Sequence, residues 1–267
     1  LNPDLEVLAP VSDNAWSRQQ QIAYLRDRDL PAPPGGGAYS INRGLWGVTI
    51  GGKETLDYRE SLPEDAWVLT RHAFESPLPG QRHVLTFASG IPVALDDEEM
   101  DPVALIEEIE RQAAGYGIGR GIHLGDTVLG TKGRVAFEAP AAEVILTAHR
   151  ELEKLTMTGS QLRIKEPLSS IYGDMLHEGQ HLDPACRDIE ALLLSSQNRV
   201  TGRVQLMFRS GHVFVEGAIS PYSLLAATKG SYGEAAGEWT AADALGFSRV
   251  RSLPGMLYTR AGEGEGT

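Results

Sequence analysis

The sequence predicts an α+β fold in which helices pack on a mixed, largely antiparallel sheet. Two pairs of short alternating runs, within 83–95 and 203–218, each flank a two-residue turn, as the strands of β-hairpins do. Longer stretches carry apolar residues at helical spacing, at 101–115, 143–156 and 183–200. Hairpins combined with amphipathic helices indicate antiparallel strands that bury one face under helices.

The N-terminal segment has the pattern of a strand followed by a helix. Residues 5–9 alternate like a strand, and Ser17 is placed to cap a helix from Arg18 to about Arg28. Pro31–Gly37 is the best candidate for a domain boundary. We therefore expect three parts: the tail of an α/β domain at 1–35, an α+β domain at 36–260, and a disordered acidic tail at 261–267.

The predicted helices have recognisable ends. Asp101-Pro102 and Asp183-Pro184 each supply an N-cap and a first-turn proline, and the first of these helices ends near Gly115, a candidate left-handed cap. A further helix ends near Glu178 or Gly179. Residues 240–246 predict a short capped helix.

Composition narrows the class of protein. The 267 residues are 42% hydrophobic and 22% charged, with a formal net charge of −12 and a single cysteine, Cys186. The sequence has no basic stripe of the kind that binds nucleic acid. No apolar run is long enough to span a membrane, and no secretory leader is visible. One cysteine is typical of a reducing cytoplasm, and a small-molecule ligand or protein partner is favoured. The first residue is Leu, which suggests that the sequence belongs to a longer chain.

Two glycine-rich segments, 38–52 and 117–140, are the main candidates for a ligand site. Glycine costs conformational entropy, so a dense run is typical of turns or of places where a ligand approaches the backbone. The second segment also interleaves fixed charges with its glycines. A surface hairpin and a ligand site both remain open, and we expect the two segments to meet.

His177-Glu178-Gly179-Gln180-His181 matches the H-E-x-x-H zinc-peptidase pattern. That chemistry needs both histidines on one face of a continuous helix. Gly179 inside the motif and the new helix start at Asp183-Pro184 favour a turn between two helices instead. We therefore expect no metal site, and a zinc hydrolase remains a remote alternative. Cys186 lies in an apolar helix, which predicts a buried thiol.

Several segments resemble argininosuccinate synthase, in order and spacing. They are Tyr39–Gly47, which looks like that family's Ser-(Ile/Met)-Asp-x-Asn-Leu segment, and Gly117-Ile-Gly-Arg120, Gly130-x-Lys-Gly-Arg134 and Phe137-Glu-Ala-Pro140, which resemble its Gly-Val-Gly-Arg, Gly-x-Lys-Ser-Arg and Tyr-Glu-Thr-Pro. Further matches continue to Asp243–Phe247. The likeness covers nearly the whole chain.

The resemblance implies a carbon–nitrogen ligase that joins citrulline and aspartate at the expense of ATP and yields argininosuccinate, AMP and pyrophosphate. Adenylation of the ureido oxygen supplies a leaving group, which the aspartate amine displaces. ATP with Mg²⁺ is bound mainly by an N-terminal half whose Ser-Gly-Gly-x-Asp-Thr-Ser loop does not occur here. Residues 1 to about 30 resemble only the end of that nucleotide-binding domain. The resemblance thus implies a citrulline-binding and tetramer-forming portion, inactive by itself. The long basic C-terminal helix common in the family is not evident after Phe247.

The resemblance also suggests substrate-binding residues. Ser40 matches a serine that contacts citrulline, and Thr49 stands where a second serine is usual. The family's citrulline-binding Glu falls at Gly125 and its Tyr at Phe137, which keeps the packing of a ring without the hydroxyl.

Four charged neighbours complete the expected site. Asp126 and Glu138 are candidates to replace the lost acidic partner of the substrate ammonium. Lys132 and Arg134 are candidate catalytic, anion-facing residues, with surface ion pairing as the alternative for each. A binding or assembly module of the same fold without catalysis is the second function that the sequence leaves open.

Overall fold

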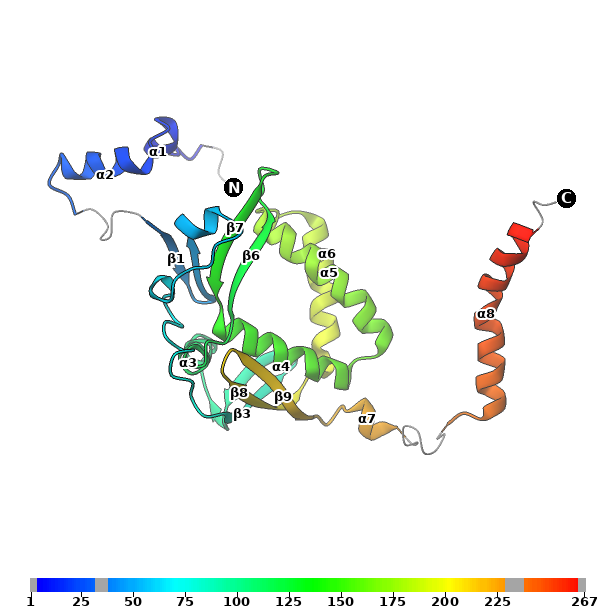
Figure 1. Ribbon diagram of the computed structural model, residues 1–267. Coiled ribbons are helices and arrows are strands. Elements are labelled where there is room, and N and C mark those ends of the chain that lie inside the picture. The colour runs from blue at the N-terminus through cyan, green and yellow to red at the C-terminus, as the bar shows by residue number, and fades with distance from the viewer. Residues whose placement is uncertain (1–3, 32–37, 229–237, 264–267) are drawn as a thin grey trace.

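The computed structural model describes residues 4–31, 38–228 and 238–263. Within them, strands form two sheets, here called sheet A and sheet B (Figure 1). Sheet A has the order β1–β2–β7–β6, with bounds Ser40–Gly44, Gly47–Gly51, Lys132–Glu138 and Arg120–Asp126. Sheet B has the order β5–β4–β3–β8–β9, with bounds Glu98–Glu99, Ile91–Leu95, Gln81–Ala88, Gly202–Arg209 and His212–Ile219. Every pairing among the described strands is antiparallel, which confirms the α+β class and makes the sheets antiparallel rather than mixed.

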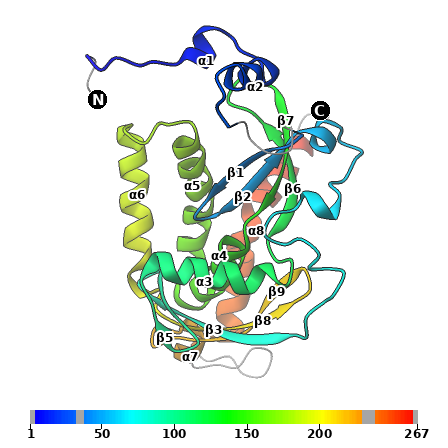
Figure 2. The same ribbon diagram turned by 90° about the vertical axis from the view of Figure 1, so that its left-hand side faces the viewer.

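Helices α3 (Pro102–Ala114) and α4 (Pro140–Thr156) cover one face of sheet B, with sheet A beyond them (Figure 2). Their apolar faces and those of β3 and β8 form the main core, which includes Phe87, Ile109, Leu152 and Leu206, each at most 1% exposed. Full burial of such side chains contributes about 1.5–3 kcal/mol each. This core confirms the helical and hairpin periodicities of the sequence.

The N-cap of α3 is as predicted, because the Asp101 carboxylate accepts a hydrogen bond from the backbone of Val103. The left-handed cap predicted at Gly115 is wrong, since its φ is −61°. Gly117 takes a φ of +70° instead, and a Cβ there would lie 2.4 Å from the Phe74 ring. Glycine is needed at this later position for both reasons.

Helices α5 (Gly159–His177) and α6 (Pro184–Ser196) form a helical hairpin that rises beside sheet A (Figures 1 and 2). Both were predicted, and each begins with a capping side chain, Thr158 or Asp183. Cys186 is buried, as expected. Short 3₁₀ turns occur at Lys53–Leu56, Glu64–Ala66 and Gln197–Arg199.

The N-terminal helices α1 (Pro10–Asp13) and α2 (Arg18–Arg26) lie apart from the sheets (Figure 1). Ser17 caps α2, as predicted. The strand predicted at residues 5–9 is wrong: this segment has no strand partner among the described residues, and Val7 is 79% exposed. Strand hydrogen bonds require a neighbouring strand. Most of the Pro31–Gly37 break lies outside the described residues.

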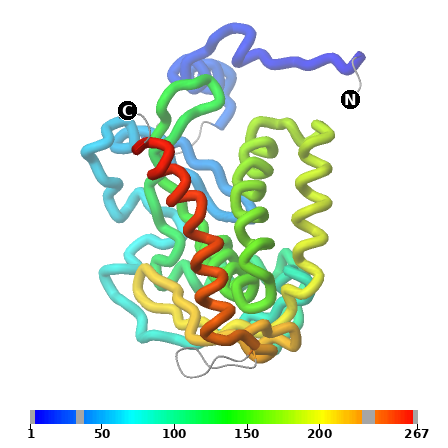
Figure 3. The backbone as a smooth tube through the Cα atoms, turned by 90° about the vertical axis from the view of Figure 1, so that its right-hand side faces the viewer, coloured from blue at the N-terminus to red at the C-terminus, as the bar shows by residue number. Residues whose placement is uncertain are grey.

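After α7 (Leu224–Ala227), the C-terminal helix α8 (Ala241–Glu263) stands away from the body in Figure 1 and passes in front of it in the view of Figure 3. The short helix predicted at 240–246 and the absence of a long C-terminal helix are therefore wrong. Residues 261–263 form the last turn of α8, and the remainder of the predicted disordered tail lies outside the described residues. Among the described helices, none has both the length and the apolar character required to cross a membrane.

Candidate functional site

The two glycine-rich segments meet in sheet A, as the sequence led us to expect. Residues 38–52 supply the β1–β2 hairpin, and residues 117–140 supply the β6–β7 hairpin. The hairpins join through β2 and β7, where Thr49 pairs with Phe137. Since side chains alternate along a strand, the register divides the residues of sheet A between two faces.

One face of sheet A is covered by residues 53–80, here called the covering segment. Leu62, Ala66 and Trp67 of this segment pack against Val48, Ile50 and Ala136 of the sheet. By the register of β2, β7 and β6, the side chains of Glu138, Arg120 and Arg134 lie on this same face of the sheet. The fixed charges of the β6–β7 hairpin therefore point toward the covering segment.

Glu138 is fully buried and holds the covering segment in place. Its carboxylate accepts hydrogen bonds from the backbone amides of Val68, Leu69 and Thr70, at 2.8, 3.0 and 2.7 Å. The Thr70 hydroxyl donates a fourth at 2.6 Å. A carboxylate with this many internal donors has a structural role, and the substrate contact expected from the sequence stays a prediction.

Arg120 forms the second fastening of the same segment. Its guanidinium contacts the Glu64 carboxylate at 2.5 and 3.1 Å and donates to the Thr70 hydroxyl at 2.8 Å. It also lies 4.5 and 4.6 Å from the ring centroids of Trp67 and Phe74, within cation–π range. The hydrogen bond from Arg120 holds the pKa of Glu64 below its usual value, while burial opposes this shift.

Arg134 fastens the beginning of the covering segment. It donates to the backbone carbonyls of Glu54, Asp57 and Glu60, at 2.8, 2.5 and 2.7 Å. Nearby, the Tyr39 hydroxyl donates to the Glu54 carboxylate at 2.6 Å, and this bond raises the pKa of Tyr39 to about 12. These contacts give Arg134 a structural role, and its anion-facing role stays a prediction.

Lys132 and Asp126 pair with each other at the far end of the hairpin. Their charged atoms are 2.6 Å apart, and their side chains are 68% and 71% exposed. Such a surface pair contributes about 0–1 kcal/mol. Both residues stand an even number of strand positions from Arg134 and Glu138, or opposite such a position. They therefore lie on the same side of sheet A as the covering segment, here called the covered face.

The other face of sheet A, here called the open face, combines three of the expected substrate-binding residues. Ser40 and Thr49 are exposed and Phe137 is half-buried. By alternation Asn42, His123 and Val135 share this face. Half of its strand positions are glycines: Gly44, Gly47, Gly51, Gly121, Gly125 and Gly133.

The glycines of the open face leave room for rings to lie flat. A Cβ on Gly121 would be 2.6 Å from the Phe137 ring, and a Cβ on Gly125 would be 2.4 Å from the His123 ring. A side chain at either position would displace the neighbouring ring from this placement. Sequence reasoning did not select His123, although its alternation with Gly121 and Gly125 in the predicted hairpin was a usable signal.

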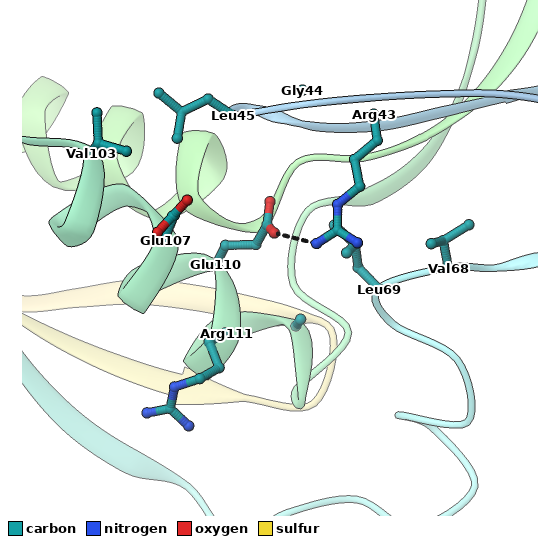
Figure 4. Close-up of a pocket in the computed structure, with 10 residues that line it drawn as sticks. Arg43, Gly44, Leu45, Val68, Leu69, Val103, Glu107, Glu110 and Arg111 are labelled. Carbon is teal, nitrogen blue, oxygen red and sulfur yellow. Dashed lines mark ion pairs between the residues drawn. The ribbon is translucent and has the colours of Figure 1, made fainter.

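A cavity of about 830 Å³ lies at the β1–β2 turn, outside the open face (Figure 4). Arg43 points into it from β1 and lies 3.6 Å from Glu110 of α3. Burial raises the pKa of Glu110, and the neighbouring carboxylate of Glu107 adds to the effect, whereas Arg43 opposes it. Leu45 and Val103 provide apolar walls.

The H-E-x-x-H motif does not form a continuous helix. Helix α5 ends at His177, Glu178 is its C-cap, and Gly179 has a φ of +77°. The two histidines therefore do not share one helical face. In the described part of the chain, no three His, Cys, Asp or Glu residues are grouped so as to hold a metal ion.

Comparisons with known proteins agree with this architecture. The family model described as the arginosuccinate synthase C-terminal domain matches residues 39–258. An argininosuccinate synthase of Methanocaldococcus jannaschii is 33% identical over 256 residues, which covers 96% of this chain and 64% of that protein. Those of Methanothermobacter thermautotrophicus and Dictyoglomus turgidum are 38% and 35% identical, and cover 83% and 98% of this chain. The chain spans 55–65% of the length of these relatives.

Proposed function

The chain belongs to the argininosuccinate synthase family, and we propose that it supplies the citrulline-binding and oligomerisation part of an ATP-dependent carbon–nitrogen ligase. The ligase would condense citrulline with aspartate to argininosuccinate in the cytoplasm, and release AMP and pyrophosphate. The single observation that carries the proposal is the shared face of sheet A. Ser40, Thr49 and Phe137, which the family resemblance singles out, lie on one side of one sheet.

The proposed contribution of this chain is binding and orientation. Hydroxyl groups of Ser40 and Thr49 can both donate and accept hydrogen bonds, and the Phe137 ring offers an apolar surface for a methylene chain. Holding the acceptor in one geometry removes much of the entropic barrier of a bimolecular reaction. Lys132 and Asp126 remain candidates for contact with a substrate only at the end of the β6–β7 hairpin, where they form an ion pair with each other.

ATP and Mg²⁺ are proposed to bind mainly to the portion of the relatives that this chain does not span. Within the described residues, the open face has His123 as its one titratable side chain, and no acidic group is arranged to hold a metal. The residues here do not fit a Mg²⁺ site, so we assign them no step that involves the nucleotide.

We expect citrulline to bind this chain, and to bind about tenfold more weakly after Ser40→Ala or Thr49→Ala, because each change removes one hydrogen-bonding hydroxyl. Isothermal titration calorimetry measures this, with the chain alone and with the N-terminal half of a relative added. Ser210→Ala, in the exposed β8–β9 turn of sheet B, is the matched control that removes a hydroxyl away from sheet A, and it should leave the affinity unchanged. Absence of citrulline binding in both mixtures would overturn the citrulline assignment and favour a non-catalytic module.

We also propose that α8 docks on another copy of the chain, within a tetramer. None of its residues is buried, and Phe247, Val250 and Leu257 are 71%, 68% and 60% exposed. Apolar exposure of this extent on one helix is typical of an interface.

Val250→Ser with Leu257→Ser is therefore expected to shift the chain from an oligomer to smaller species, because it removes apolar area from the contact. Sedimentation equilibrium gives the mass directly. Leu129→Ser, at an exposed turn, serves as the control and should keep the original mass. A wild-type monomer, or an unchanged mass in the double variant, would contradict the assignment of α8.

A further inference from the structure

His123 occupies an unusual position on the open face. It is exposed and has no hydrogen bond or ion pair with any described residue. Its ring lies across Gly125, where any Cβ would come within 2.4 Å of Nε2. The imidazole thus occupies space that a side chain at residue 125 would otherwise fill, and both its nitrogens stay available to a ligand.

The open face is unsuited to a positive charge. Its twelve strand positions comprise six glycines together with Ser40, Asn42, Thr49, His123, Val135 and Phe137, and none is acidic. The nearest carboxylates of the same hairpin, those of Asp126 and Glu138, belong to the covered face, and each has a partner there. A carboxylate offsets the lost hydration of an ammonium group better than the neutral acceptors of the open face do.

A carboxylate, by contrast, finds suitable partners on this face. The imidazole can donate an N–H to it, and the hydroxyls and the Asn42 amide add neutral donors. Hydrogen bonds to a charged acceptor are stronger than neutral ones. Among these positions His123 alone has a side chain that can carry a positive charge, so it would contribute most to the preference for a carboxylate over a neutral group.

We propose that His123 determines the specificity of the open face, where it binds the carboxylate of the acceptor, and that this face accepts ω-ureido acids with or without an α-ammonium group. The proposal rests on the proposed function, because it assumes that a ureido acceptor binds to sheet A. It widens the substrate class from citrulline to its des-amino analogues.

The test is calorimetric titration of the chain with three probes: L-citrulline, 5-ureidopentanoate, which lacks the α-amino group, and citrulline amide, which lacks the carboxylate charge. We expect the first two to bind within about threefold of each other and the amide about tenfold more weakly. His123→Ala should remove the preference for the carboxylate. Glu99→Gln, which removes an exposed carboxylate charge on β5 of sheet B, should alter nothing.

A double variant, His123→Ala with Gly125→Glu, provides the converse test. Removal of the ring makes room for a carboxylate at residue 125, and citrulline should then bind about tenfold more tightly than 5-ureidopentanoate. Circular dichroism verifies that each variant is folded. A tenfold preference of the wild-type chain for citrulline over 5-ureidopentanoate, or an unchanged profile in His123→Ala, overturns the inference alone. Failure of all three probes to bind overturns the proposed function as well.

Discussion

Replacement of Glu138 by Ala is expected to lower the free energy of unfolding by about 3–5 kcal/mol. The carboxylate is 0% exposed and accepts from three consecutive amides and one hydroxyl of the covering segment. Its loss leaves these donors without acceptors, and each buried unsatisfied group costs about 1–3 kcal/mol. Urea denaturation followed by circular dichroism measures the difference.

Two controls separate this role from a general effect of removing charge. Glu143→Ala removes an exposed carboxylate at the start of α4 and should stay within about 0.5 kcal/mol of wild type. Glu138→Gln keeps the volume and one acceptor oxygen, so it should fall between the two. Trp67 of the covering segment is 4% exposed, and its fluorescence should shift to the red in Glu138→Ala. If Glu138→Ala were as stable as Glu143→Ala, the proposed role of Glu138 in holding the covering segment would be contradicted.

Four strands of sheet B and most helices could be predicted because their signals are local. Alternation over five to eight residues marks β3, β4, β8 and β9, and an aspartate followed by a proline marks the start of α3 and α6. The meeting of the glycine-rich segments was also expected. The sequence did not show on which face of the sheet Asp126 and Glu138 lie. They follow Gly125 and Phe137 directly, and a shift of one residue along a strand moves a side chain to the opposite face.

Other features could not be predicted from local pattern. The covering segment has no periodic pattern of apolar residues. Its hydrogen bonds to Glu138 join residues that are separated by 68 to 70 positions in the sequence. Helix α8 contains Gly246, Pro254 and Gly255, which predict breaks, yet the structure continues through them. Residues 5–9 alternate as a strand does, but a strand forms only where a partner is present.

The second large effect is expected at Arg120, where replacement by Met should destabilise the chain by about 2–4 kcal/mol at neutral pH. The side chain of Arg120 is 9% exposed, and it is held between two rings and the Glu64 carboxylate. Met fills much of the same volume, so the loss reports the charge and its hydrogen bonds more than a cavity. Urea midpoints of the two proteins at pH 7 provide the measurement, and Arg111→Met, at an exposed arginine paired within α3, is the matched control.

The same variant should have an altered response to acid. Arg120 holds the pKa of Glu64 below its ordinary value in the folded chain. A lowered folded-state pKa adds stability above the unfolded-state value of about 4.3, and this contribution disappears as the pH falls toward the folded-state pKa. The difference in stability between wild type and Arg120→Met should therefore narrow between pH 7 and about pH 3. If the difference is constant across this range, the ion pair with Glu64 contributes nothing, and Arg120 acts through the two rings and Thr70.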